Sequence, residues 1–320
     1  MLLHYLVVGL ATPSTPPMGP APAAVLQALR PMVPPIAPGA AATLVLQREN
    51  DIDSLAWLTS PPSLALVSGG RPFICDPRPS RRSVNPLPQA AATTSRLAAL
   101  DESHIACCTA KGVIAMPTSP PKAFAQAPAP LLGALGLGAA RCAVPARGGR
   151  LLVASGDAVV LLRPEAPPCP LMRGELPAAT VSLAISDDAR TLHLCTATGV
   201  ARAALDLDAA TAAPAERVPE LAFRGGAALA VDVDGSLFVA TADGLLVSDE
   251  EGEVLLTMPT PSPASDLCFG GQQGSELFFS TGTQLWSVPT STRGVRPPSA
   301  AFLRAIDKQT AAGEFRHAGW

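Results

Sequence analysis

The sequence predicts an all-β chain that folds as a six-bladed β-propeller. The first observation is a short apolar segment with a small residue near its centre, which occurs six times: Ser54-Leu55-Ala56-Trp57, Arg96-Leu97-Ala98-Ala99, Arg141-Cys142-Ala143-Val144, Ser182-Leu183-Ala184-Ile185, Ala228-Leu229-Ala230-Val231 and Asp266-Leu267-Cys268-Phe269. The second residues of these segments are separated by 42, 45, 41, 46 and 38 residues. A blade of four short strands uses roughly 40–45 residues, so each recurrence marks one blade.

A second set of apolar segments follows the first, and we expect these to be the second strands of the blades. They are Leu64-Ala65-Leu66-Val67, His104-Ile105-Ala106-Cys107, Leu151-Leu152-Val153-Ala154, Leu192-His193-Leu194-Cys195, Leu237-Phe238-Val239-Ala240 and Leu277-Phe278-Phe279-Ser280. Packing is the simplest role for the two histidines in this set. Small central residues suit a ring in which neighbouring blades pack face to face.

The fifth blade shows the strand and turn pattern most clearly. Turns at 233–235, 242–244 and 250–252 each end in Gly and separate four apolar segments between residues 229 and 256. Acidic residues followed by Gly are typical of β-hairpins. We interpret Asp232-Val233-Asp234-Gly235 as a hairpin turn rather than a calcium loop. An EF-hand would need Gly and Glu where Leu237 and Asp243 stand.

The remaining elements follow from proline content and strand pattern. Residues 1–40 are rich in Pro and Ala, and we expect a disordered leader ahead of a propeller spanning 41–290. The strand pattern at residues 43–46 precedes the first blade, so it is a candidate to complete the last blade and close the ring. Pro-rich links are expected at 117–130 and 163–170. A C-terminal tail spans 291–320, with either a short helix near 299–307 or no regular structure.

Composition narrows the function classes. The 320 residues carry 23 Lys and Arg against 26 Asp and Glu, a net charge of −3. The basic run at 78–82 lies in a Pro-rich loop without aromatic residues, so we expect no nucleic-acid partner. No apolar stretch reaches the ~18 residues of a membrane span, so we expect no membrane partner. We expect a monomer.

The cysteines and the first residues of the chain bear on its compartment. The seven cysteines are an odd number without C-x-x-C spacing, which favours reduced, buried thiols. The apolar stretch 2–10 has no basic residues ahead of it, so secretion is not supported. Both observations favour a cytoplasmic location.

Candidate site residues lie just ahead of the innermost strands, which meet at one mouth of the channel in a propeller. One residue before each first-set segment stand Asp53, Ser95, Ala140, Val181, Ala227 and Ser265. Asp53 and Asp266 come from the first and sixth blades, which ring closure makes neighbours. They could hold a cation together with Asp51. Alternatively, each could accept hydrogen bonds from backbone amides ahead of its strand, which is common for Asp.

Two stretches resemble the last two blades of the senescence-marker-protein/gluconolactonase (regucalcin-like) family. They are 228–240 (ALAVDVDGSLFVA) and 265–271 (SDLCFGG), followed by Glu276-Leu277-Phe278. The likeness covers about 60 residues well, and weaker matches at 53–57 and 182–192 extend it over the propeller. The resemblance implies a six-bladed hydrolase of lactones or related esters that uses one divalent cation, calcium or zinc, in the channel mouth.

The resemblance also implies which positions would hold the cation. The family places a Glu at the position of Asp53, an Asn at Val181 and an Asp at Ala227, and a substrate-side Asn near Ala140. Asp53 is a shortened carboxylate, whereas Val181 and Ala227 offer no oxygen to a hard cation. We therefore expect degenerate ligand positions at Val181 and Ala227, with Asp53 and Asp266 as the remaining candidate metal ligands.

Two functions remain open on the sequence alone. The chain could be a metal-dependent hydrolase of lactones or small esters, catalytically impaired by the lost ligands. It could instead be a non-catalytic propeller that binds a small ligand or a protein. The catalytic residues are not identified by the sequence, and no G-x-S-x-G, H-E-x-x-H or P-loop motif is present.

Overall fold

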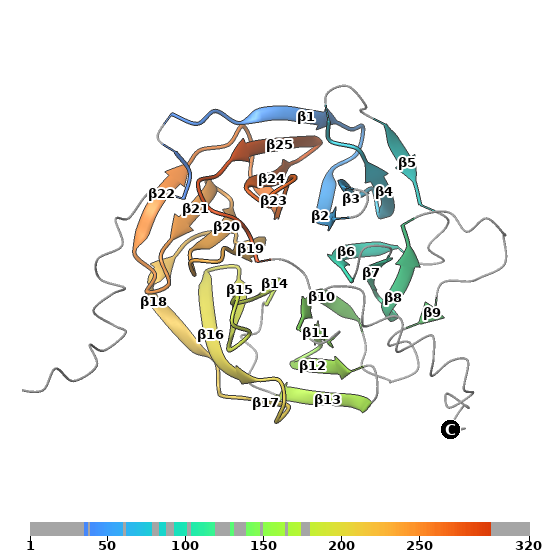
Figure 1. The fold of residues 1–320 in the computed structure, drawn as a ribbon, viewed down its shortest axis with the longest axis vertical. Coiled ribbons are helices and arrows are strands. Elements are labelled where there is room, and N and C mark those ends of the chain that lie inside the picture. The colour runs from blue at the N-terminus through green and yellow to red at the C-terminus, as the bar shows by residue number, and fades with distance from the viewer. Residues whose placement is uncertain are drawn as a thin grey trace, which may run out of the picture. The chain divides into compact units, whose positions relative to one another are not determined.

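The computed structural model describes residues 35–37, 39–59, 62–78, 83–87, 93–100, 104–118, 129–130, 139–147, 150–163, 166–173 and 180–295. Within these ranges every regular element is a β-strand, and the strands form six antiparallel sheets arranged around a central axis (Figure 1). The all-β, six-bladed propeller predicted from the sequence is confirmed. No helix among the described residues is long and apolar enough to cross a membrane.

Each sheet is one blade, and strands with equivalent places in the blades recur in chain order. The innermost strands are β2 (Ile52–Thr59), β6 (Thr94–Ala99), β10 (Ala140–Ala146), β14 (Ser182–Ile185), β19 (Ala228–Val231) and β23 (Ala264–Gly270). The second strands are β3 (Pro62–Ser68), β7 (His104–Thr109), β11 (Arg150–Ser155), β15 (Thr191–Thr196), β20 (Leu237–Thr241) and β24 (Glu276–Thr281). Both sets contain the segments predicted for them.

The outer half of each blade is built from the following strands. The third strands are β4 (Arg71–Cys75), β8 (Gly112–Pro117), β12 (Ala158–Arg163), β16 (Gly199–Asp206), β21 (Gly244–Ser248) and β25 (Gln284–Pro289). The outermost strands are β5 (Val84–Pro86), β9 (Ala129–Pro130), β13 (Ala166–Arg173), β17 (Thr211–Ala212) with β18 (Glu216–Ala222), β22 (Val254–Met258) and β1 (Thr43–Gln47). In the fourth blade both β17 and β18 pair with β16.

The ring closes because β1 joins the last blade. β1 pairs antiparallel with β25, which makes the sheet order β1-β25-β24-β23, and the two strands lie side by side at the rim in Figure 1. The closing strand predicted at residues 43–46 is confirmed. A strand from the start of the chain thus covers an edge that the sixth blade would otherwise leave open.

The Pro-rich stretches expected to link blades contain strands instead. β13 lies mostly within 163–170, and β9 ends the stretch 117–130. Both are outermost strands, in which proline is tolerated at residues whose nitrogen faces away from the partner strand. The proline content misled the prediction because an edge strand and a link tolerate proline equally.

The core is divided among the blade interfaces. Six clusters of buried apolar residues occur in the described part of the chain, and each joins two adjacent blades around the ring. Each sheet is therefore covered on both faces, and a second strand such as β20 is buried along its whole length. This is why the second-strand segments read as continuous apolar runs rather than alternating ones.

The propeller begins earlier in the chain than the predicted boundary at residue 41. Ile36, within the expected leader, is only 4% exposed and packs in the cluster between the fifth and sixth blades. Ser291 N donates to the carbonyl oxygen of Pro35. The packed unit therefore begins before residue 41. The rest of the leader, 1–34, and the possible helix at 299–307 lie outside the described residues.

Other local predictions are confirmed. All seven cysteines are free thiols, and five of them are buried. The hairpin turn after β19 is an Asp turn: Asp232 Oδ1 accepts hydrogen bonds from the amides of Asp234 and Ser236, at 2.9 and 2.8 Å. Gly235 follows with φ of +92°, a conformation that favours glycine.

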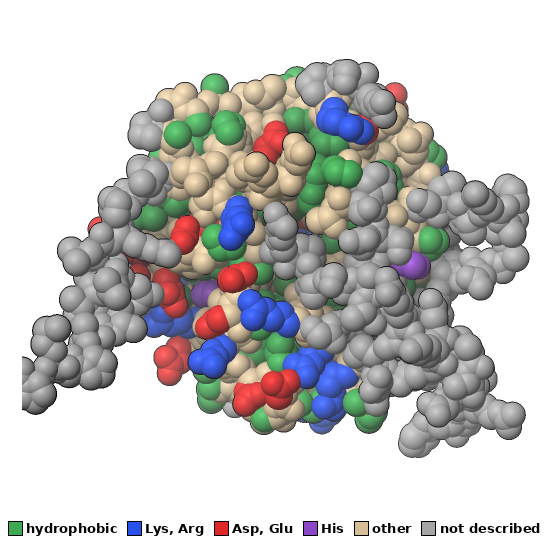
Figure 2. Space-filling model, in the orientation of Figure 1, with side chains coloured by type: hydrophobic (Ala, Val, Ile, Leu, Met, Phe, Trp, Pro, Cys, Tyr) green, Lys and Arg blue, Asp and Glu red, His purple; other side chains and the backbone are tan. Residues whose placement is uncertain are grey.

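Charged side chains of both signs are interspersed on the face seen in Figure 2. Two ion pairs join the third blade to the fourth: Arg150 Nη2 lies 2.6 Å from Asp208 Oδ1, and Arg147 Nη2 lies 3.8 Å from Asp187 Oδ2. Asp208 and the Arg147–Asp187 pair are well exposed, so these contacts contribute little to stability.

His193 makes the stability of the fold depend on pH. The side chain is 2% exposed on β15, and burial, followed by the charge of Arg202, lowers the pKa of His193 to about 4. The unfolded chain, in which the histidine has a pKa near 6.5, takes up the proton first, so stability is lost as pH falls from 6.5 toward 4.

We expect protonation of His193 to lower the free energy of unfolding by about 2 kcal/mol between pH 7 and pH 5. Urea titrations should show that His193→Leu removes this part of the decline, whereas a His104→Leu control retains it. An unchanged pH profile in His193→Leu would contradict the assignment.

Candidate functional site at the central channel

The pairing of innermost and second strands defines equivalent positions around the channel. In each blade the second strand ends at a Ser or Thr, where the hairpin to the third strand begins. The residue just before this Ser or Thr pairs with a residue of the innermost strand. The innermost partners are Ser54, Arg96, Cys142, Ser182, Ala228 and Asp266. We call this level of the channel the first ring position. In five blades it is the first residue of the predicted segment.

The third blade departs from the predicted alignment by one residue. Its register shifts between Ala140 and Cys142, so Arg141 is the extra residue of a β-bulge. Equivalent bulges fall at Asp53, Ser95 and Ser265 in three other blades. Arg141, not Ala140, is therefore the third-blade counterpart of Asp53. The apolar residue Cys142 holds the first ring position of this blade, and the apolar pattern matched it to the leucine that follows that position in other blades.

A hydrogen bond between blades recurs at the first ring position. Ser54 Oγ accepts from Leu97 N of the next blade at 2.9 Å, and Ser182 Oγ accepts from Leu229 N at 3.2 Å. Asp266 Oδ2 accepts from Leu55 N at 2.7 Å, which joins the sixth blade to the first. The other three first-ring residues are Arg, Cys and Ala, which offer no comparable acceptor.

Asp266 is also paired with an arginine from across the channel. Arg96 Nη1 of the second blade lies 3.0 Å from Asp266 Oδ2. Arg96 Nη2 donates to the carbonyl oxygen of Ala227 at 2.9 Å, and Nη1 lies 3.4 Å from the carbonyl oxygen of Ser265. The second, fifth and sixth blades are thus tied together by one side chain. We call this end of the channel the carboxylate mouth.

The electrostatics of this mouth follow from burial and charge. Burial would lower the pKa of Arg96, but the Asp266 carboxylate outweighs it, and the pKa is raised overall. The pKa of Asp53 is raised by partial burial and by Asp51, although Arg96 acts in the opposite direction. The Cys142 thiol, one of the first-ring residues, has its pKa raised to about 12, mainly by burial. The thiol is therefore protonated and inert as a nucleophile at neutral pH.

The predicted metal positions offer few free side-chain oxygens to a cation. Asp53 and Asp51 are exposed, while Val181 and Ala227 present hydrocarbon side chains. Asp266 Oδ1 accepts from Leu267 N at 2.9 Å, so both of its oxygens already have partners. No group of three or more His, Cys, Asp or Glu suited to a metal occurs among the described residues. The residues present therefore do not fit a divalent cation.

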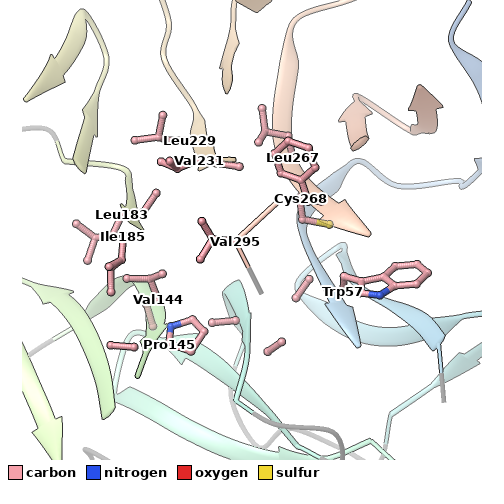
Figure 3. A pocket seen from close by; sticks show the side chains of 18 of the residues that line it. Trp57, Val144, Pro145, Leu183, Ile185, Leu229, Val231, Leu267, Cys268 and Val295 are labelled. Atoms are coloured by element: carbon pink, nitrogen blue, oxygen red, sulfur yellow. The ribbon is translucent and has the colours of Figure 1, made fainter. Parts of the chain in front are cut away.

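An apolar pocket of about 210 Å³ fills the channel beyond the first ring position. Its wall is made by the three residues that follow that position in each innermost strand, among them Leu183, Leu229 and Leu267 (Figure 3). Trp57 lines the same wall and stacks on Phe278, with ring centroids 5.3 Å apart. The polar lining residues Arg147, Ser186 and Asp187 follow the ends of β10 and β14.

Residues 293–295 bring the chain back to this pocket after the last strand. Val233 N donates to the carbonyl oxygen of Arg293, and Val295 N donates to that of Val231. Gly294 lies so close to Phe269 that an added Cβ would be 2.2 Å from the Phe269 Cβ. The Val295 side chain consequently stands among the lining residues in Figure 3. Sequence spacing gave no signal for this return, since the predicted pattern ends near residue 290.

Comparison with solved structures gives the same architecture. The fold is similar to a candidate gluconolactonase (TM-score 0.68, 16% identity, 84% of this chain and 98% of that one). It is also similar to a gluconolactonase of Xanthomonas campestris (TM-score 0.66, 19% identity, 81% and 92%) and to the calcium-binding protein regucalcin of Agrobacterium tumefaciens (TM-score 0.66, 13% identity, 81% and 97%).

The chain shares the six-bladed fold of these proteins. The resemblance drawn from residues 228–240 and 265–278 is thereby confirmed for the fold. The chain matches no protein-family model and no curated protein by sequence. Identities of 13–19% establish a common architecture, and a common architecture does not by itself specify chemistry.

Asp266 and Asp53 should respond very differently to the same substitution. Asp266→Ala removes the carboxylate that pairs with Arg96 and leaves a largely buried guanidinium without its counter-charge. The side chains of Arg96 and Asp266 are 20% and 9% exposed. Removing one partner of such a pair costs about 3–5 kcal/mol of unfolding free energy. Asp53→Ala, one blade away and exposed, should cost less than about 1 kcal/mol. Chemical denaturation of both variants measures the difference, and equal losses would contradict the role given to Asp266.

Proposed function

We propose that this chain is a binding propeller that takes a small, largely apolar molecule into the channel pocket. The observation that carries the proposal is the apolar wall contributed by all six innermost strands beyond the first ring position. Ligand pockets are commonly concave, apolar and provided with a few polar groups that orient the ligand. Here the polar groups are Arg147, Ser186 and Asp187 at the ends of β10 and β14.

The size and polarity of the pocket limit the ligand. A volume of about 210 Å³ is below the roughly 300–1,000 Å³ typical of sites for drug-sized molecules, so the ligand is small. Sugar hydroxyls would lose their hydrogen bonds to water along an apolar wall, at a cost of about 1–3 kcal/mol each. An apolar ring or short alkyl chain avoids that cost. The ligand's polar end would then point toward Arg147 and Asp187.

The alternative function is metal-dependent hydrolysis of a lactone or small ester. Its support is the fold shared with proteins described as gluconolactonases. Against it stand the hydrocarbon side chains at Val181 and Ala227 and the fully partnered Asp266 carboxylate. A divalent cation needs several oxygen ligands in fixed positions. We therefore place binding ahead of metal-dependent catalysis for this chain.

Binding of a series of lactones distinguishes an apolar pocket from a sugar-binding site. Isothermal titration calorimetry should show that γ-lactones bind more tightly as an alkyl chain on the ring lengthens to the capacity of the pocket. Glucono-1,5-lactone, which carries several hydroxyls, should not bind. Val295→Asp places an unpaired charge in the pocket and should weaken binding at least about tenfold. Val254→Asp, at an exposed site on β22, is the matched control and should leave binding unchanged. Preferential binding of the gluconolactone would sink the proposal.

Hydrolysis assays test the alternative directly. The same lactones are incubated with the wild-type protein and added calcium, zinc, magnesium or manganese, with and without a chelator. We expect no turnover that the chelator abolishes, because two of the three implied ligand positions lack oxygen. Efficient, chelator-sensitive turnover would show that the chain is a metal-dependent hydrolase. A binding result without turnover is the outcome expected for the proposed function.

A further inference from the structure

Three oxygen atoms surround the guanidinium of Arg96 at the carboxylate mouth. They are Asp266 Oδ2 at 3.0 Å from Nη1, the Ala227 carbonyl oxygen at 2.9 Å from Nη2 and the Ser265 carbonyl oxygen at 3.4 Å from Nη1. One carboxylate and two carbonyl oxygens are the donor types that hard cations take in proteins. We infer that Arg96 is a tethered cation that fills an oxygen-lined cation site, so that the channel binds no metal ion there.

The charges around Arg96 explain why a cation is needed at this place. Asp266 accepts hydrogen bonds from two backbone amides, and its side chain is 9% exposed. Asp53 and Asp51 add negative charge at the same mouth, and Arg96 is close enough to lower the pKa of Asp53. Arg141 is exposed at the bulge of the third blade. A guanidinium remains charged at every accessible pH, so it neutralises Asp266 permanently.

The inference is independent of the apolar pocket, because Arg96 and the three residues that supply its oxygen partners, Asp266, Ala227 and Ser265, do not line that pocket. It also changes what restoring the lost ligands would do. Val181→Asn combined with Ala227→Asp supplies two oxygen ligands, but it leaves the guanidinium in place. We expect no divalent cation affinity in that double variant. Adding Arg96→Ala should create it, since the oxygens then face a vacant, negatively charged site.

The central experiment is removal of the guanidinium and replacement by free cations. Arg96→Ala should melt well below the wild type, and low-millimolar calcium or guanidinium chloride should raise its midpoint by several degrees. Sodium chloride at equal ionic strength should not do so. The wild-type midpoint should respond neither to calcium nor to a chelator. Arg141→Ala, an exposed arginine one blade away, is the matched control and should melt like the wild type without any calcium response.

A second variant tests whether the Asp266 carboxylate is the group that attracts the cation. Arg96→Ala combined with Asp266→Asn removes the charge that attracts the cation, so both calcium and guanidinium should lose their stabilising effect. If Arg96→Ala does not fold in buffer, refolding is attempted with calcium or guanidinium present. Recovery of folded protein supports the inference, and failure with both cations overturns it. Calcium stabilisation of the wild type, reversed by chelator, would overturn it as well.

Discussion

The Asp266 carboxylate is the interaction on which the arrangement of the channel depends. One oxygen accepts the amide of its own strand, and the other accepts Leu55 N of the first blade and faces Arg96 of the second. A six-bladed ring must join its last blade to its first, and this carboxylate does so at the centre while β1 on β25 does so at the rim. Both links come from the sixth blade. The sixth blade therefore provides both contacts that close the ring, one at the rim and one at the centre.

The way in which Asp266 is neutralised decides what the channel can do. An arginine reaching from the second blade supplies both the counter-charge and directional hydrogen bonds to Ala227 and Ser265. Its guanidinium occupies the end of the channel where the innermost strands begin. The remaining space, toward the other end of those strands, is lined by apolar side chains. The pocket beyond the carboxylate mouth is apolar apart from Arg147, Ser186 and Asp187 at the ends of β10 and β14, an arrangement that suits a small apolar ligand with a polar end.

The fold was largely predictable from the sequence, whereas the site was predictable only in part. The six innermost segments, the second strands and the closing strand at residues 43–46 are local patterns repeated at a nearly constant interval. Arg141 was misplaced because the first ring position of its blade is held by Cys142, whose apolar side chain was matched to a leucine one position further along the other segments. The partnership of Arg96 with Asp266 joins residues far apart in sequence, and no local pattern encodes it. A charged residue opening an apolar segment was the available signal, and the sequence analysis attached no role to Arg96. Asp266 was predicted either as a metal ligand or as an acceptor for backbone amides, and its oxygens accept two backbone amides and face Arg96.

The resemblance implies oxygen ligands at Val181 and Ala227, and the hydrocarbon side chains at these positions are physically consistent with this arrangement. In a protein whose metal neutralises a buried carboxylate, cation binding and folding are coupled, so losing ligands also destabilises the fold. A covalently attached guanidinium removes that coupling, because its charge is present whenever the chain folds and does not depend on ion concentration. Ligand positions can then carry hydrocarbon side chains, as Val181 does within the apolar cluster between the fourth and fifth blades. A propeller built in this way would keep its shape without a metal ion, and its ligands would be set by the side chains that line the channel.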